Sequence, residues 1–70
     1  EERMEEPWPK LLSTAQAAER LSLAPHTLEA DRVERRYGIP YIKIGRSVRY
    51  REEDLLDFIN QRRIVPSEYE

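Results

Sequence analysis

The sequence of 70 residues contains no cysteine and only one histidine, His26. The missing thiols exclude disulfide cross-links, thiolate zinc sites and cysteine nucleophiles together. One histidine is too few for the histidine-rich ligand sets that hold zinc. The sequence therefore predicts no metal site, and it contains no motif for any other cofactor.

Long apolar runs are also missing. No segment approaches the roughly 20 apolar residues that cross a bilayer, and no secretory apolar region is present, so we expect a soluble protein without a membrane partner. A chain of 70 residues has little material for an enclosed substrate cleft. Because a nucleophile–base pair and a glycine-rich phosphate loop are also lacking, the sequence predicts neither an enzyme nor a small-molecule substrate.

Charge is distributed unevenly along the chain. The formal net charge is −2, but residues 1–31 carry −4, residues 32–51 carry +6 and residues 52–70 carry −4. The central block owes its charge to Arg32, Arg35, Arg36, Lys43, Arg46, Arg49 and Arg51. A basic segment between acidic ones is typical of a protein with one phosphate-binding face, although such charges also simply solvate a small surface.

The first half of the chain predicts two helices. Ser13 and Gln16 form a capping box for a helix over residues 14–21. Its apolar face carries Ala17, Ala18 and Leu21. Because alanine is small, a second helix can approach this face closely.

Pro25 suits the first turn of that second helix, which we expect over residues 25–36 with Leu28 and Val33 facing inward. Gly38 ends it, and Leu23 in the short connection is expected to be buried. Helix, short turn and helix together form a helix-turn-helix.

A hairpin and a third helix are predicted next. Ile42 and Ile44 alternate with Tyr41 and Lys43, and the same alternation of apolar and basic residues returns after a turn over residues 45–47. This pattern indicates two strands with an apolar inner face and a basic outer face. The third helix, over residues 52–62, begins with acidic side chains and ends with basic ones, as the helix dipole favours. Its packing stripe is Leu55, Phe58 and Ile59.

The predicted fold class is mainly α with a small β-hairpin, a winged helix-turn-helix of residues 11–63. An acidic lead of residues 1–10 and a tail of residues 64–70 are expected to be flexible. Trp8 either docks on the body or lies free, and docking is the favoured interpretation.

Two segments carry a family resemblance. LLSTAQAAERLSLAPHTL resembles the opening of the excisionase (Xis- and AlpA-like, MerR-related) winged helix-turn-helix domain. IPYIKIGRSVRYREEDLLDFI resembles its wing and final helix, with K-I-G-x-x-V-R-Y-x-x-x-D-L as the more diagnostic string. The resemblance covers residues 11–63. It implies a DNA-binding protein of a phage, plasmid or bacterium, located in the cytoplasm with the nucleoid and acting either in recombination beside an integrase or in transcription regulation.

Three positions depart from the family pattern. Ala24 stands where the family has a capping serine, and Ser22 where it has a glycine. Asp31 replaces an aromatic residue, so Val33 is expected to take over that place in the core. Glu29 and Asp31 either repel phosphate, lie solvated, or accept hydrogen bonds from cytosine, and the first two are the simpler interpretations.

The expected DNA contacts lie on the second helix and the wing. Carried over by position, they are His26, Thr27, Arg32, Arg35, Arg36, Lys43, Arg46, Ser47 and Arg49. The alternatives are ion pairs within the second helix, ordinary surface or capping roles for His26 and Thr27, and strand-edge charges that block aggregation. A module this small is expected to bind cooperatively or at several sites, with an integrase or a second copy as a further partner. The competing hypothesis is a protein-interaction adaptor that keeps the fold without binding DNA.

Overall fold

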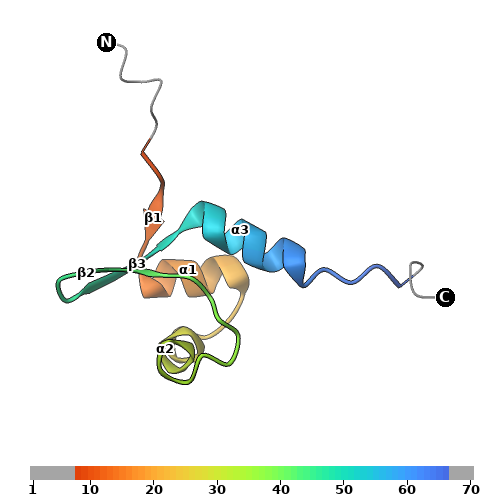
Figure 1. Ribbon diagram of the computed structural model, residues 1–70, viewed down its shortest axis with the longest axis horizontal. Coiled ribbons are helices and arrows are strands. Elements are labelled where there is room, and N and C mark those ends of the chain that lie inside the picture. Colours follow the sequence, from red (N-terminus) through yellow and green to blue (C-terminus); the bar gives the residue numbers. More distant parts are fainter. Residues whose placement is uncertain (1–7, 67–70) are drawn as a thin grey trace, which may run out of the picture.

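A computed structural model describes residues 8–66 of the chain. Within that range lie three helices and one small antiparallel sheet with strand order β1-β3-β2 (Figure 1). The elements are β1 (Leu11–Leu12), α1 (Thr14–Leu21), α2 (Pro25–Glu34), β2 (Ile42–Ile44), β3 (Ser47–Arg51) and α3 (Glu52–Gln61).

The capping box predicted for α1 is confirmed. The Ser13 hydroxyl accepts from the Gln16 N–H at 3.1 Å, and the Gln16 side chain accepts from the Ser13 N–H at 2.9 Å. The helix ends at Ser22, which adopts the left-handed conformation with φ 58°. A glycine would adopt this conformation without strain, so serine is a costly choice here.

Helix α2 begins at Pro25 as predicted, and Ala24 provides no side-chain cap. It ends at Glu34, two residues earlier than expected. The cause is Arg35, which is left-handed with φ 54° and donates its N–H to the Asp31 carbonyl at 2.6 Å. Gly38, with φ 70°, therefore turns the chain toward β2 but does not end the helix.

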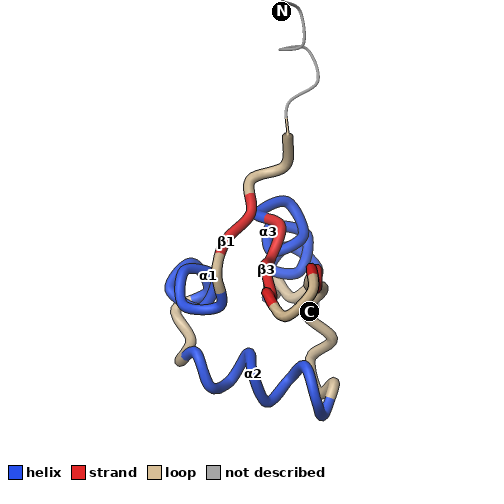
Figure 2. Tube along the Cα trace, turned by 90° about the vertical axis from the view of Figure 1, so that its left-hand side faces the viewer, coloured by secondary structure: helices blue, strands red, loops and turns tan. Residues whose placement is uncertain are grey.

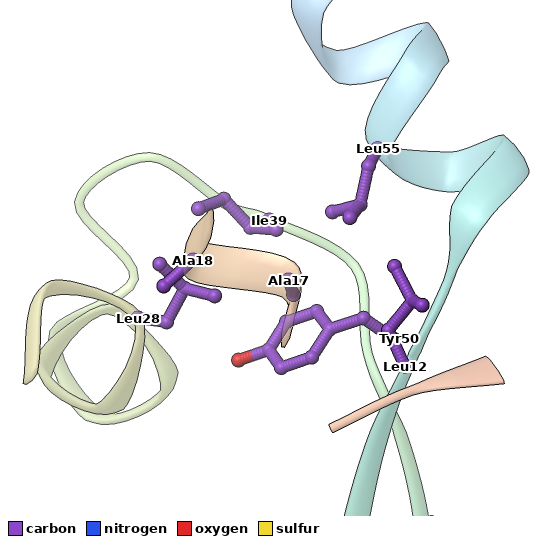
Figure 3. Packing of buried hydrophobic residues seen from close by; sticks show 7 residues of the cluster. All are labelled: Leu12, Ala17, Ala18, Leu28, Ile39, Tyr50 and Leu55. Atoms are coloured by element: carbon purple, nitrogen blue, oxygen red, sulfur yellow. The ribbon is translucent and has the colours of Figure 1, made fainter. Parts of the chain in front are cut away.

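The core lies where the helices meet the sheet (Figure 3). Its buried members are Leu12, Ala17, Ala18, Leu28, Ile39, Tyr50 and Leu55. Leu21, Val48 and Phe58 are partly buried against this cluster. Tyr50 is buried in this core, with Phe58 partly buried against the same cluster, and the Tyr50 hydroxyl points toward α2.

Four apolar side chains expected to be covered are exposed, which corrects the prediction. Trp8 is 91% exposed and Val33 is 83% exposed, while Leu23 and Ile59 are 40% and 44% exposed. Helix α2 is rotated so that positions 28, 31 and 32 face the body, and this rotation leaves Val33 on the opposite side. Ile39, from the loop after α2, fills the core instead.

Strand β1 was not predicted. It pairs with β3 through Leu11↔Arg51 and Leu12↔Tyr50. The N–H of Glu52 also donates to the Lys10 carbonyl at 3.0 Å, which ties β1 to the start of α3. The pairing brings Leu12 into the core.

The hairpin register differs from the prediction by one residue. Its turn contains Gly45 and Arg46 only, so the pairs are Ile42↔Arg49, Lys43↔Val48 and Ile44↔Ser47. Directly opposed residues project on the same face, and a shift by one residue reverses the faces of a strand. Ile42 therefore shares a face with Arg49, and Lys43 shares the other with Val48. The predicted apolar inner and basic outer faces are wrong, and Ile44 is 58% exposed.

Together these elements form a winged helix-turn-helix. Helices α1 and α2 pack on one another, and α2 runs along one side of the body (Figure 2). The β2–β3 hairpin projects away from it (Figure 1). Residues 1–7 of the expected lead and residues 67–70 of the expected tail lie outside the described residues. Among residues 8–66, no helix has the length and apolar character needed to cross a membrane.

Candidate nucleic-acid interface

Asp31 is a buried polar residue that lies between α2 and the loop that follows it. Its Oδ1 accepts from the N–H groups of Tyr37 at 2.5 Å and Gly38 at 3.2 Å, and its Oδ2 accepts from the Ile39 N–H at 2.9 Å. The interpretation of Asp31 as a solvated or phosphate-repelling residue is wrong, because its side chain is only 4% exposed. It fixes the loop that leads from α2 to the hairpin.

The environment of Asp31 favours its charged form. Burial alone raises the pKa of this carboxyl, but the backbone donors of Tyr37, Ile39 and Gly38 lower it, and the positive charge of Arg62 does so too. The net pKa lies below the ordinary value of 3.8. A carboxylate at this position is therefore ionised whenever the domain is folded near neutral pH.

Arg32 holds α2 against the rest of the domain. Its Nη1 donates to the Tyr50 hydroxyl at 2.7 Å and to the Thr14 hydroxyl at 3.2 Å. Its guanidinium carbon lies 5.9 Å from the centre of the Tyr41 ring. One side chain thus connects α2 with α1, with β3 and with the residue before β2. It thereby sets the position of α2 relative to the hairpin.

Tyr50, the buried partner of Arg32, has a shifted pKa. Burial raises the pKa of Tyr50 above 10.0, and the hydrogen bond from Arg32 opposes that rise. The Tyr50 hydroxyl therefore stays protonated and accepts the charged donor.

Carboxylates pair with two of the seven cations in the central block. Arg36 lies 3.5 Å from Glu34, and Arg51 pairs with Glu53 and, at 3.9 Å, with Asp54. The other five cations of the block have no carboxylate partner among residues 8–66. Arg32 bonds to two hydroxyl groups instead, and the other four are Arg35, Lys43, Arg46 and Arg49. The seven cationic side chains therefore differ in availability, and the hairpin carries three of these last four.

The hairpin presents cations on its tip and on both faces. Arg46 occupies the turn, while the register places Lys43 and Arg49 on opposite faces. Ser47 is exposed beside the tip, and Arg49 donates from Nη1 to the Val48 carbonyl at 2.8 Å. A two-stranded ribbon charged in this way has a positive group for each wall of a groove that it enters.

The remaining predicted DNA-contact residues lie at the two ends of α2. His26 is exposed, whereas Thr27 is half-buried and its N–H donates to the Ala24 carbonyl at 3.0 Å. Arg35 is exposed at the other end of the helix. The helix and the hairpin thus form one candidate interface, with Arg32 inside it as a brace.

A family model described as a helix-turn-helix domain matches residues 11–63. The chain belongs to this family. The match runs from β1 past the end of α3, so the helix-turn-helix protein is covered over nearly all of its described residues. None of the curated proteins compared with it matches. Helix-turn-helix domains are typically non-enzymatic, and the partner that the family implies is DNA.

Proposed function

We propose that this helix-turn-helix protein binds duplex DNA with α2 in the major groove and the hairpin on the adjacent minor groove or backbone. In the cell it serves either as an excisionase-like recombination directionality factor or as a transcription regulator. The observation that carries the proposal is the projecting hairpin, whose Lys43, Arg46 and Arg49 have no carboxylate partner among the described residues.

Groove dimensions support this arrangement. A major groove about 12 Å wide admits an α-helix, and arginine is favoured in a narrow minor groove because its negative potential is enhanced. Guanidinium groups stay charged and bind phosphate through two donors. Since Arg32 joins α2 to Tyr50 in β3, the helix and the hairpin approach the duplex as one rigid unit.

The acidic segments on either side of the central block lower the affinity of a single copy. The net charge of −2 adds no general attraction to DNA. We therefore expect binding at several sites or cooperative binding with a second copy or an integrase. An integrase gene beside this one would favour the recombination role, and a regulated operon would favour the transcription role.

The test is a titration of labelled random duplex by fluorescence anisotropy at several salt concentrations. We expect micromolar binding at low salt with a steep salt dependence, because bound counterions are released. Replacing Arg46 and Arg49 with alanine removes up to two phosphate contacts, so the slope of log K against log salt should fall by about two. The matched control replaces Lys10 and Arg63, which are exposed away from the hairpin, and should leave that slope nearly unchanged.

Two results would count against the proposal. Unchanged binding by the Arg46→Ala, Arg49→Ala variant removes the hairpin from the mechanism. Absence of binding by the unaltered chain at micromolar concentration favours the second candidate, the protein-interaction adaptor. The acidic residues of the outer surface of α2 and the negative net charge are the observations that support that candidate.

A further inference from the structure

The outward face of α2 is formed by His26, Glu29, Ala30 and Val33. These positions follow the i, i+3, i+4, i+7 spacing of one helix face, and all four residues are exposed. Val33 is 83% exposed, although valine is a residue that proteins usually bury. Val33 lies at the C-terminal end of this exposed face, where its methyl groups are free to contact a DNA base.

This face contains no lysine or arginine. The only arginine of α2 is Arg32, the helix has no lysine, and the Arg32 guanidinium is turned inward to Tyr50 and Thr14. The commonest specific contact in the major groove, arginine or lysine to guanine, is therefore not available from within α2. Beyond His26 at the start of the helix, this face offers DNA bases only apolar groups and the Glu29 carboxylate.

Those two groups match two pyrimidine features. Apolar side chains contact the C5 methyl group of thymine, and a carboxylate accepts from the N4 amino group of cytosine. Both purines present the N7 acceptor in the same groove, and a carboxylate is repelled by an acceptor. The spacing adds a register, since four residues of helix rise about 6 Å, which is about two base-pair steps along a duplex.

We propose that α2 reads pyrimidines, with Val33 against a thymine methyl group and Glu29 accepting from a cytosine amino group about two steps away. Ala30, between them on the same face, leaves room for the bases to approach. This inference rests on the proposed function, because it names the bases that the same surface selects. The hairpin supplies affinity, and the outward face of α2 supplies selectivity.

Glu29 gives the proposal an unusual signature. Its charge repels phosphate, so Glu29→Gln should bind random duplex more tightly than the unaltered chain. Glutamine pairs with adenine through two hydrogen bonds, so the same variant should exchange its cytosine preference for adenine, with about a tenfold change in relative affinity. A purely structural role of Glu29 would not move affinity and base preference in this way.

The experiment selects binding sites from duplexes with a randomised central segment, for the full chain and for Glu29→Gln and Val33→Ala. Each thymine of the selected site is then replaced by deoxyuridine, which removes only the methyl group. At one thymine we expect about a fourfold loss of affinity, the factor for one buried methyl group at about 0.8 kcal/mol. Val33→Ala should be insensitive to that replacement. Leu56→Ala, which truncates a side chain 56% exposed on α3, is the control and should keep the full sensitivity.

The outcomes separate this inference from the proposed function. Retained DNA binding with no sensitivity to deoxyuridine, and an unchanged consensus for Glu29→Gln, overturns pyrimidine reading alone. Failure of every duplex in the pool to bind overturns both proposals. Circular dichroism of each variant confirms that the exposed substitutions leave the fold intact.

Discussion

Replacing Asp31 by asparagine tests the role of the one carboxylate that is buried among residues 8–66. The carboxylate accepts from the backbone N–H groups of Tyr37, Gly38 and Ile39. Asparagine has one acceptor oxygen, so its amide group would face at least one of these donors. The donor that suffers most is the Ile39 N–H, because Ile39 is only 4% exposed and water does not replace the lost bond.

The expected loss follows from that single bond. A hydrogen bond to a charged group contributes about 1.5–3 kcal/mol, so we expect the free energy of unfolding to fall by about 2 kcal/mol. Domains of this size are stable by about 4–10 kcal/mol, so the change is large. With a urea m-value near 1 kcal/mol/M, the unfolding midpoint should fall by about 2 M.

The dependence on pH identifies the carboxylate as the cause. The pKa of Asp31 is below 3.8 in the folded chain, so its stabilisation is complete above that value and is lost as the pH falls toward the folded pKa. The difference between the unaltered chain and Asp31→Asn should therefore be full at pH 7 and smaller below pH 4. Glu29→Gln, an exposed change on the same helix, is the control. A midpoint for Asp31→Asn at pH 7 within about 0.5 M of the unaltered value would refute this reasoning.

Two further predictions concern the supports of α2. Ala24→Ser adds the missing cap, so we expect about 1 kcal/mol of added stability and a melting temperature about 5 °C higher by calorimetry. No gain would show that the N–H groups at the start of α2 already have partners. Tyr50→Phe removes the acceptor of the Arg32 bond and should cost about 1.5 kcal/mol in urea unfolding, whereas a cost near zero would remove Arg32 as a brace.

Local sequence signals were enough to predict where α1 and α2 begin. The cap of α1 needs only Ser13 and Gln16, three residues apart, and Pro25 marks the start of α2 by its own backbone geometry. These features depend on neighbours along the chain, so one sequence contains them. The family strings in residues 11–63 supplied the order of the remaining elements.

Other features depend on partners distant in sequence. Strand β1 has two residues, too few to show a period, and exists because β3 pairs with it. The faces of the hairpin depend on whether Ser47 belongs to the turn or to the strand, a difference of one residue. Asp31 looks like a surface residue until the loop at residues 37–39 folds back over it. Its position in place of a core aromatic, six residues before a loop with glycine, is the signal that identifies it.

The sequence predicts only part of the candidate site. The positions of the hairpin cations follow from composition and family strings, but the inward direction of Arg32 follows from the tertiary bond to Tyr50. Likewise, the prediction that Val33 lies in the core is wrong because tertiary contacts of Asp31 and Arg32 set the rotation of α2. On this helix the charged Asp31 is buried and the apolar Val33 is exposed, the opposite of what their side chains alone would predict.

The most direct test of DNA binding by α2 and the hairpin is an NMR titration of the full chain with duplex DNA at low salt, in which every backbone amide is followed. We predict shifts concentrated at residues 26–33 of α2 and 42–49 of the hairpin, with the amides around Leu56 in α3 unchanged. Shifts confined to α3 and β1, or no shifts at a duplex concentration above that of the protein, would contradict DNA binding by this surface.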